Sequence, residues 1–303
     1  MTLNLRQRLI ARQEAGELIV APGVYDMISL RLADRLGFEA LYMTGYGTVA
    51  SLLGLPDAGL ATYSDMVCRV ERMAQMARTP LIADADTGYG GLLNVEYTVR
   101  GYERAGAAGI QIEDQEFPKR CGHTPNRRVI DAEDMALKVK VAVESRSSRD
   151  FLVIARTDAR TSLGLDEALR RAELYARHGA DLLFVESPES ERELERIGAA
   201  LRGGPGLVVN MIEGGRTPIL GADELARLGF AVALYPASGF LAVAAALERS
   251  YGDLIRHGSS GPDTDRLFSF DAMNKLMGFD EVWRRDRELG AWTGTDAPDE
   301  GAS

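Results

Sequence analysis

Residues 152–187 read LVIARTDARTSLGLDEALRRAELYARHGADLLFVES and contain one complete strand–helix–strand unit. Leu152-Val153-Ile154-Ala155 is a short aliphatic run, typical of a strand that is buried on both faces. Residues 164–178 place apolar side chains at three- and four-residue spacing, which predicts a helix. His178-Gly179-Ala180 then suits a left-handed helix C-cap. Because Leu182-Leu183-Phe184-Val185 repeats the strand pattern, the stretch predicts a parallel β–α–β unit.

The same unit recurs along the chain. Eight aliphatic runs are separated by helical patterns, which are clearest over 131–147, 164–178, 190–201 and 221–229. The runs are Leu18–Ala21, Ala40–Met43, Leu81–Asp84, Gly109–Ile112, Leu152–Ala155, Leu182–Val185, Leu207–Asn210 and Val232–Tyr235. Asp131, Asp166 and Ser190 stand where helix N-caps are expected, and Gly37, Gly106, Gly179 and Gly229 stand where C-caps are expected. Eight parallel strands favour the α/β class and a closed (β/α)8 barrel.

The length suits one barrel with an appendage. The chain has 303 residues, 46% of them hydrophobic and 26% charged, and a barrel of this type needs about 250. We predict a catalytic barrel over residues 1–240 and a helical extension over 241–290. Residues 291–303 are small and acidic and are predicted to be disordered.

Charge and composition exclude several classes of function. The formal net charge is −10 and the pI is near 5.0, which argues against binding to nucleic acid or to an acidic membrane surface. Residues 1–20 carry scattered charges and no continuous apolar run, so we expect no signal peptide, no membrane span and a cytoplasmic location. The two cysteines, Cys68 and Cys121, are too few for a disulfide framework.

Acidic residues stand at the ends of two neighbouring strands. Asp84 and Asp86 follow the third run and Glu113 follows the fourth. The strand ends of a barrel converge on one face, where the reactive groups lie. An oxygen-rich cluster there suits a hard divalent cation, and Mg2+ usually retains several waters. The alternative is that these carboxylates only cap loops and helices.

Two further segments point to chemistry. Pro118-Lys119-Arg120-Cys121-Gly122-His123 surrounds a thiol with cations and a histidine, which stabilise a thiolate and allow acid–base catalysis near neutral pH. An incidental surface cysteine is the alternative. Thr44-Gly45-Tyr46-Gly47 ends the second run with small residues and open backbone N–H groups, which can receive a carboxylate. A plain turn would have the same sequence.

These motifs together resemble the isocitrate lyase and phosphoenolpyruvate mutase superfamily, and within it the short lyases that act on 2-methylisocitrate or 2,3-dimethylmalate. The resemblance extends from about Val20 to Ser238. Its carriers are Ala21–Asp26, Tyr42–Gly47, Gly54–Asp57, Asp84–Gly90, Ile112–Gln115, Lys119–His123 and Ala155–Ala159.

The resemblance implies a (β/α)8 barrel with Mg2+, or Mn2+ in its place, near Asp84, Asp86 and Glu113, bound largely through water. The substrate carboxylate would meet Thr44, Gly45 and Tyr46, with Asp57 close by. It also implies a homotetramer in which neighbouring subunits exchange the C-terminal helices, which would account for residues 240–290.

For lyases of this superfamily, the resemblance implies cleavage to pyruvate or glyoxylate and the enolic form of a dicarboxylate. Cys121 would protonate that intermediate, and Arg156 would stabilise negative charge on the 2-oxo product. His123, Lys119 and Arg120 would tune the thiol and hold the distal carboxylate.

The remaining predicted roles concern the proton acceptor and the substrate contacts. Tyr42, Glu113 and Glu186 are the alternatives for the base that takes the 2-hydroxyl proton, and the sequence does not rank them. Gly122, Glu186 and Asn210 complete the predicted contacts with the substrate.

The substrate prediction depends on two departures from the patterns of related enzymes. Phosphonate-processing members usually carry Asn-Ser or similar residues where this chain has Cys121-Gly122, which argues against phosphoryl transfer. Methylisocitrate lyases have a Ser-x-Phe-Arg pattern after the eighth strand, whereas this chain reads Ser238-Gly239-Phe240-Leu241. The loss of that cation argues against a tricarboxylate substrate. The runs Thr44–Thr48 and Asn210–Pro218 resemble those of the dimethylmalate-type lyases and favour such an enzyme, which releases pyruvate. An oxaloacetate hydrolase or decarboxylase and a carboxyphosphonoenolpyruvate mutase are alternatives on the same site, although decarboxylases of the superfamily lack the cysteine motif. A catalytically silent, metabolite-binding barrel is the alternative of another class.

Overall fold

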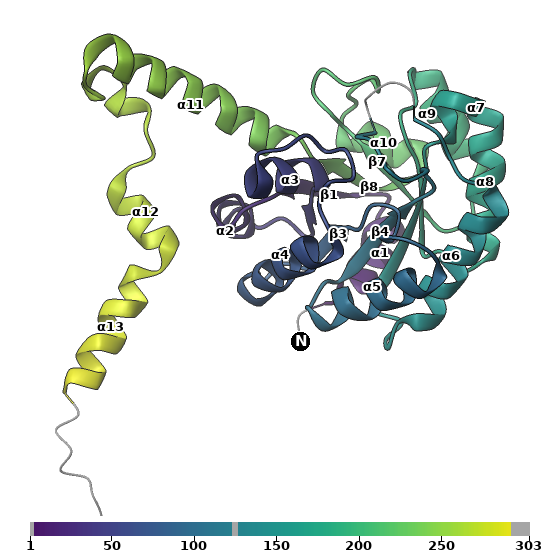
Figure 1. Ribbon diagram of the computed structural model, residues 1–303, viewed down its shortest axis with the longest axis horizontal. Coiled ribbons are helices and arrows are strands. Elements are labelled where there is room, and N and C mark those ends of the chain that lie inside the picture. The colour runs from purple at the N-terminus through teal and green to yellow at the C-terminus, as the bar shows by residue number, and fades with distance from the viewer. Residues whose placement is uncertain (1–2, 123–126, 292–303) are drawn as a thin grey trace, which may run out of the picture. The chain divides into compact units, whose positions relative to one another are not determined.

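The computed structural model describes residues 3–122 and 127–291 (Figure 1). The chain divides into two compact units, residues 1–244 and 245–303. The division falls inside one long helix, α11 (Ser238–His257). The first unit contains every strand of the described chain.

Eight parallel strands form a closed barrel in which each strand pairs with the next in sequence and β8 pairs with β1. The strands are β1 (Ile19–Val24), β2 (Leu41–Met43), β3 (Leu81–Asp84), β4 (Gly109–Glu113), β5 (Leu152–Thr157), β6 (Leu182–Val185), β7 (Gly206–Asn210) and β8 (Phe230–Tyr235). Every strand overlaps its predicted run, so the predicted (β/α)8 barrel is confirmed.

Helices follow the strands and surround the barrel (Figure 1). Those of the first unit are α1 (Leu5–Glu14), α2 (Met27–Leu36), α3 (Gly45–Leu53), α4 (Tyr63–Met76), α5 (Leu92–Arg104), α6 (Ala132–Ser145), α7 (Ala159–Leu163), α8 (Leu165–Arg177), α9 (Glu191–Ala200) and α10 (Ala222–Leu228). The four predicted helical ranges match α6, α8, α9 and α10 to within the usual one or two residues.

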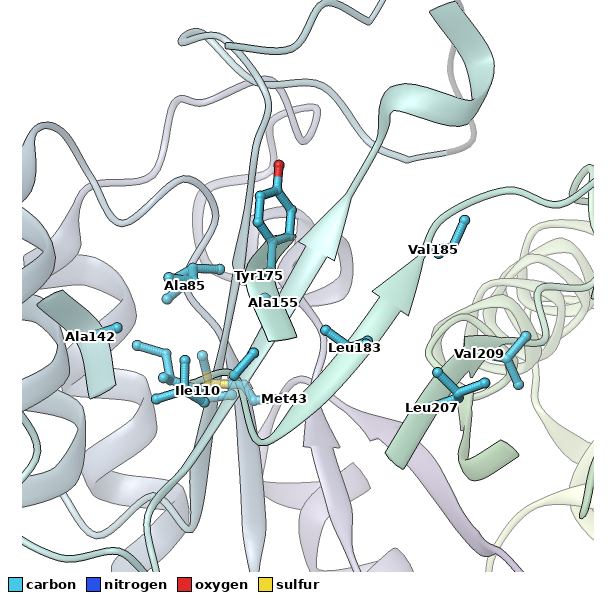
Figure 2. Packing of buried hydrophobic residues seen from close by; sticks show 14 of the residues in the cluster. Met43, Ala85, Ile110, Ala142, Ala155, Tyr175, Leu183, Val185, Leu207 and Val209 are labelled. Atoms are coloured by element: carbon cyan, nitrogen blue, oxygen red, sulfur yellow. The ribbon is translucent and has the colours of Figure 1, made fainter. Parts of the chain in front are cut away.

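Alternation along the strands separates two hydrophobic layers. On β5, Leu152 and Ile154 belong to a cluster inside the barrel, whereas Val153 and Ala155 belong to the layer between the barrel and its helices. Figure 2 shows members of that outer layer, including Ala155 and Leu183. Because successive side chains point to opposite faces, the residues at every second position point into the barrel.

Helix α1 supplies the interior cluster with apolar side chains that no strand provides. Leu5 and Leu9 are buried and pack with the inward side chains of the strands. The helix was absent from the sequence prediction. Its position in the interior cluster means that it closes one end of the barrel.

The helix ends agree with most of the predicted caps. Gly37, Gly106, Gly179 and Gly229 all have positive φ, which only glycine adopts without strain. Ser190 caps α9 by accepting a hydrogen bond from the backbone N–H of Glu193 at 3.2 Å. The prediction for Asp166 is wrong, because α8 begins two residues earlier than a cap at 166 would require and Gly164 occupies the N-cap.

The second unit is helical. It contains the end of α11, a 3-10 helix (Gly261–Arg266), α12 (Phe270–Met277) and α13 (Phe279–Gly290). Among its described residues only Leu276 is buried. Neither unit has, in its described part, a helix long and apolar enough to cross a membrane.

Candidate active site

Inward-pointing side chains meet at the carboxyl ends of the strands. Tyr42 lies in the interior cluster, and Asp84, Arg156 and Asn210 each follow an interior residue by two positions on its strand. The cavity above them has a volume of about 260 Å³. Its lining combines these side chains with Thr44, Tyr46, Asp57, Glu113, Lys119, Arg120, Cys121, Gly122, Ile212, Glu213, Gly214, Gly215, Pro236, Ala237, Phe240 and Leu241. The strand register thus brings most of the predicted site residues around one cavity.

Buried carboxylates outnumber the cations beside them at the β2 and β3 ends. Lys119 is 3% exposed, and its Nζ lies 2.5 Å from Oδ1 of Asp57 and 2.7 Å from Oδ1 of Asp86. Burial raises the pKa of Asp84, and it raises the pKa of Asp86 to about 7. Burial alone would lower the pKa of Lys119, but the surrounding carboxylates hold it well above its usual value. Lys119 therefore stays protonated and balances only part of the negative charge.

The acidic cluster fits a hard cation that keeps water ligands. Oδ1 of Asp86 is buried and accepts no hydrogen bond of good geometry, although Lys119 lies within ion-pair distance. Asp84 uses Oδ1 to accept from the backbone N–H of Asp86 at 3.1 Å. Among the described residues, no three His, Cys, Asp or Glu side chains converge closely enough to ligate one ion. Since Mg2+ is commonly held by one or two carboxylates and several waters, this donor set fits it.

Arg156 is held among three carboxylates. Its Nε and Nη2 donate to the two oxygens of Asp158 at 3.0 and 2.9 Å. Nη1 lies 3.3 Å from Oε2 of Glu113, and Nε lies 3.5 Å from Oε2 of Glu186. This bidentate arrangement fixes the guanidinium plane. A fixed, buried cation therefore faces the cavity beside Glu113.

Tyr42 is a hydrogen-bond donor in this site. Its hydroxyl donates to Oε1 of Gln111 at 2.8 Å, and burial raises its pKa well above the usual value. A phenol of raised pKa keeps its proton. Among the alternatives for the base, Tyr42 is thus the least suited, and Glu113 lines the cavity whereas Glu186 does not.

The segment that carries Cys121 is fastened to the barrel by polar contacts. Gln115 accepts from the backbone N–H of Arg120 at 2.9 Å and donates to its carbonyl at 2.8 Å. A Cβ on Gly122 would lie 2.3 Å from Nη2 of Arg156, so this position allows the segment to lie against the guanidinium. Cys121 is partly buried and lines the cavity. His123 lies outside the described residues.

Three predicted site residues lie behind the cavity wall. Gly45 is packed so closely that a Cβ would lie 2.5 Å from Oδ2 of Asp84. Asp86 contacts Lys119, and Glu186 accepts from Nδ2 of Asn210 at 2.8 Å.

An apolar wall at the opposite end of the cavity was not among the predicted site residues. Phe240 packs against Tyr46, with ring centroids 5.2 Å apart, and against Tyr25 at 6.1 Å. Ile212 and Leu241 extend this surface. The departure at Leu241 was the only sequence signal for it, because packing between distant loops leaves no local pattern.

Comparison with known proteins identifies the family. Residues 9–255 match the family model described as phosphoenolpyruvate phosphomutase. The chain is 44% identical over 281 residues to 2,3-dimethylmalate lyase of Eubacterium barkeri, covering 92% of this chain and 96% of that protein.

Two solved structures agree with this result. Oxaloacetate acetylhydrolase in complex with the inhibitor 3,3-difluorooxalacetate is 35% identical, with a TM-score of 0.87 and coverage of 94% of this chain and 96% of that chain. Phosphonopyruvate hydrolase in complex with oxalate and Mg2+ is 29% identical, with a TM-score of 0.83 and coverage of 93% and 98%. The cavity, its acidic strand ends and these matches lead to one conclusion: the chain belongs to the phosphoenolpyruvate mutase/isocitrate lyase superfamily and is an enzyme of its lyase type.

Proposed function

We propose that this enzyme is a Mg2+-dependent carbon–carbon lyase that cleaves a small, alkylated 2-hydroxy dicarboxylate, such as 2,3-dimethylmalate, to pyruvate and a second carboxylate. One observation carries the proposal. Cys121, Arg156 and Glu113 line the same cavity, which is charged at the end formed by β3 to β5 and, apart from Glu213, largely apolar at the end formed by β7 and β8. A thiol, a cation and a carboxylate are the groups that this cleavage needs.

The substrate carboxylate next to the 2-hydroxyl would bind at the start of α3. Thr44 occupies the N-cap without a side-chain capping bond, and the first backbone N–H groups of the helix lie beside the cavity lining. A helix N-terminus favours an anion through these N–H groups and through its dipole. Gly45 supports this contact, since its missing side chain leaves room for the Asp84 carboxylate.

The proton transfers can be assigned to residues of this cavity. Glu113 would accept the 2-hydroxyl proton as the bond between C2 and C3 breaks and its electron pair moves to C3. Arg156, fixed by Asp158, would stabilise the negative charge on the oxygen that becomes the 2-oxo group. Cys121 would donate a proton to C3 of the enolic product, which completes the second carboxylate.

Asp84 and Asp86 would hold the metal, with Glu113 contacting it through water. The bound Mg2+ would supply positive charge to the 2-oxo oxygen and its neighbouring carboxylate. Lys119 would keep Asp57 and Asp86 in place.

The apolar wall supports an alkylated substrate over a tricarboxylate. Among the described residues of the cavity lining, the cations are Lys119, Arg120 and Arg156, all at its charged end. At the other end a third carboxylate would meet Phe240, Leu241 and the carboxylate of Glu213. An alkyl group would instead be buried there at a gain of about 0.8 kcal/mol for each CH2.

An assay of the purified protein with Mg2+ tests the reaction. We expect pyruvate from 2,3-dimethylmalate and little from 2-methylisocitrate, isocitrate or malate. Acetate and oxalate from oxaloacetate would instead identify a hydrolase, a new C–P bond a mutase, and no product from any of these substrates a silent barrel.

Replacement of Cys121 tests the role of the thiol. Cys121→Ser should lose at least 100-fold in turnover, on the order of the contribution of a general acid, and should keep its melting temperature. Cys68→Ser is the matched control, because Cys68 is exposed on α4. Full activity of Cys121→Ser would refute the role of proton donor.

We also propose that the second unit serves assembly into a homotetramer. Its helices expose large apolar side chains, among them Ile255, Phe270 and Trp283, and another copy of the chain would cover them by exchange of these helices. Sedimentation equilibrium should give the mass of four chains. A monomer at micromolar concentration would contradict the proposal.

A further inference from the structure

Ser187 makes contacts that the proposed mechanism does not use. It follows β6 and Glu186, it is 1% exposed, and its φ is +57°. A residue with a Cβ rarely adopts this left-handed conformation and is held there only when its surroundings require it. The position therefore needs a reason beyond the local chain.

The hydroxyl of Ser187 joins both arms of the segment that carries the thiol. Its Oγ donates to the backbone carbonyl of Gly122 at 2.8 Å, and Nη2 of Arg127 donates to the same Oγ at 3.3 Å. Oγ also lies 3.1 Å from Oε1 of Glu186, which is longer than its contact with Gly122. The shorter contact therefore assigns the hydroxyl proton to Gly122.

Gly122 is the residue after Cys121, so this bond acts one residue from the thiol. Arg127 is itself fixed, because Nη1 donates to Asp158 at 2.5 Å. The other arm is held by Gln115 through Arg120. Without the Ser187 hydroxyl, the carbonyl of Gly122 loses this donor.

We propose that Ser187 is a positioning residue whose hydroxyl fastens the Cys121–Gly122 segment over the cavity and thereby sets the position of the thiol. Loss of the hydroxyl removes one neutral hydrogen bond from the fastened state. This corresponds to about a 2- to 12-fold shift of the equilibrium toward states in which the segment is released. The effect on catalysis rests on the proposed role of Cys121. The effect of Ser187 on the position of the thiol is independent of that role.

Alkylation of Cys121 by iodoacetamide measures the proposal directly. The enzyme would carry Cys68→Ser, so that Cys121 is its single thiol. The rate constants of the variants would be compared at their high-pH limit, where a difference in thiol pKa has no effect. We expect Ser187→Ala and Ser187→Gly both to raise this rate constant about 2- to 12-fold. Glycine relieves the positive φ whereas alanine keeps it, so the pair separates the hydroxyl from backbone strain.

Ser190→Ala is the matched control. Ser190 lies in the same loop, and its replacement removes the cap of α9. Among the described residues, no hydrogen bond joins its side chain to the Cys121 segment. An unchanged rate in Ser187→Ala overturns the proposal. A faster alkylation in Ser187→Ala that is absent in Ser187→Gly would also overturn it, because the effect would then come from backbone strain. An equal increase in Ser190→Ala would do the same, because the effect would then come from general loosening of the loop.

Steady-state kinetics gives the second readout. With 2,3-dimethylmalate, the factor by which the alkylation rate rises and the factor by which kcat/KM falls in Ser187→Ala should multiply to about 2- to 12-fold, because a released segment can be alkylated and only a fastened one can protonate the product. If Cys121→Ser proves fully active, the catalytic role fails while the alkylation result still decides the role of Ser187. A product of the two factors near one, with neither rate changed, would overturn the proposal.

Discussion

Replacement of Asp114 should destabilise the barrel and disturb Arg156 at the same time. This carboxylate is fully buried and follows Glu113 at the end of β4. One oxygen accepts from Thr157 Oγ1 at 2.7 Å, Arg171 Nη1 at 3.0 Å and Tyr175 OH at 2.8 Å. The other accepts from the backbone N–H of Asp158 at 2.8 Å. Four donors, from the end of β5, the residue after it and α8, thus depend on a single side chain.

The expected cost comes from the donors that would be left behind. Burial raises the pKa of Asp114, so burying its charge opposes folding, and the ion pair with Arg171 adds little net stability. Removing one member of a buried pair nevertheless costs about 3–5 kcal/mol, because the partner charge stays buried and unpaired. We expect this loss for Asp114→Ala. Asp114→Asn should lower the free energy of unfolding by about 1–3 kcal/mol. The amide oxygen can still accept, but the amide NH2 would face groups that are themselves hydrogen-bond donors.

Glu167→Gln is the matched control. Glu167 is the second carboxylate partner of Arg171, with Nε to Oε1 at 2.9 Å, but its side chain is 26% exposed. A pair that solvent reaches is worth about 0–1 kcal/mol. Urea unfolding at one fixed protein concentration would rank the three variants, because concentration affects the stability of an oligomer.

Activity gives an independent check on Asp114. The backbone N–H of Asp158 donates to Asp114, and the Asp158 side chain in turn fixes Arg156. Asp114→Ala should therefore lower kcat even at temperatures where it stays folded. Equal stability of Asp114→Ala and Glu167→Gln would refute the reasoning, since it would mean that the buried donors find other partners.

Two further predictions concern the metal and the substrate. Mg2+ at a hundred times its Kd should stabilise the enzyme against unfolding by about 2.7 kcal/mol, which thermal denaturation would measure. Asp84→Asn should lose this effect. An equal effect in both proteins would place the ion elsewhere. Leu241→Arg should raise kcat/KM for 2-methylisocitrate relative to that for 2,3-dimethylmalate by about 10- to 150-fold, the value of a charge-assisted hydrogen bond. The neutral control Leu241→Gln should not change this ratio. Equal ratios in the two variants would show that the apolar wall does not select the substrate.

The strand ends were predictable because the chemistry follows the periodicity of the barrel. Side chains alternate between the two faces of a strand. Since Ile82 and Ile154 point inward, Asp84 and Arg156, two residues further on, point inward as well. Parallel closure then brings the ends of distant strands to one face. The sequence therefore predicts which polar side chains share the cavity, even though 72 residues separate Asp84 from Arg156.

The contacts that refine the site were not predictable in the same way. Ser187 lies in no motif, and Asp158 lies within the Ala155–Ala159 motif but had no predicted role. The roles of both residues appear only when loops far apart in the sequence meet. The choice among the proton acceptors likewise depended on where the Tyr42 hydroxyl points, and its partner Gln111 lies on another strand. Side-chain direction at a strand end is set by neighbours, not by local propensity.

The placement of the thiol has a physical consequence for the whole site. Polar groups of the barrel fasten the segment around Cys121. Lys119 forms ion pairs with Asp57 and Asp86, and the carbonyl of Gly122 accepts a hydrogen bond from Ser187. In a buried site these contacts are strong when complete and costly when one partner is lost. A change in the charge of the acidic cluster should therefore reach the thiol through Lys119, without direct contact. It follows that the reactivity of Cys121 reports on the integrity of the acidic cluster as well as on its own surroundings.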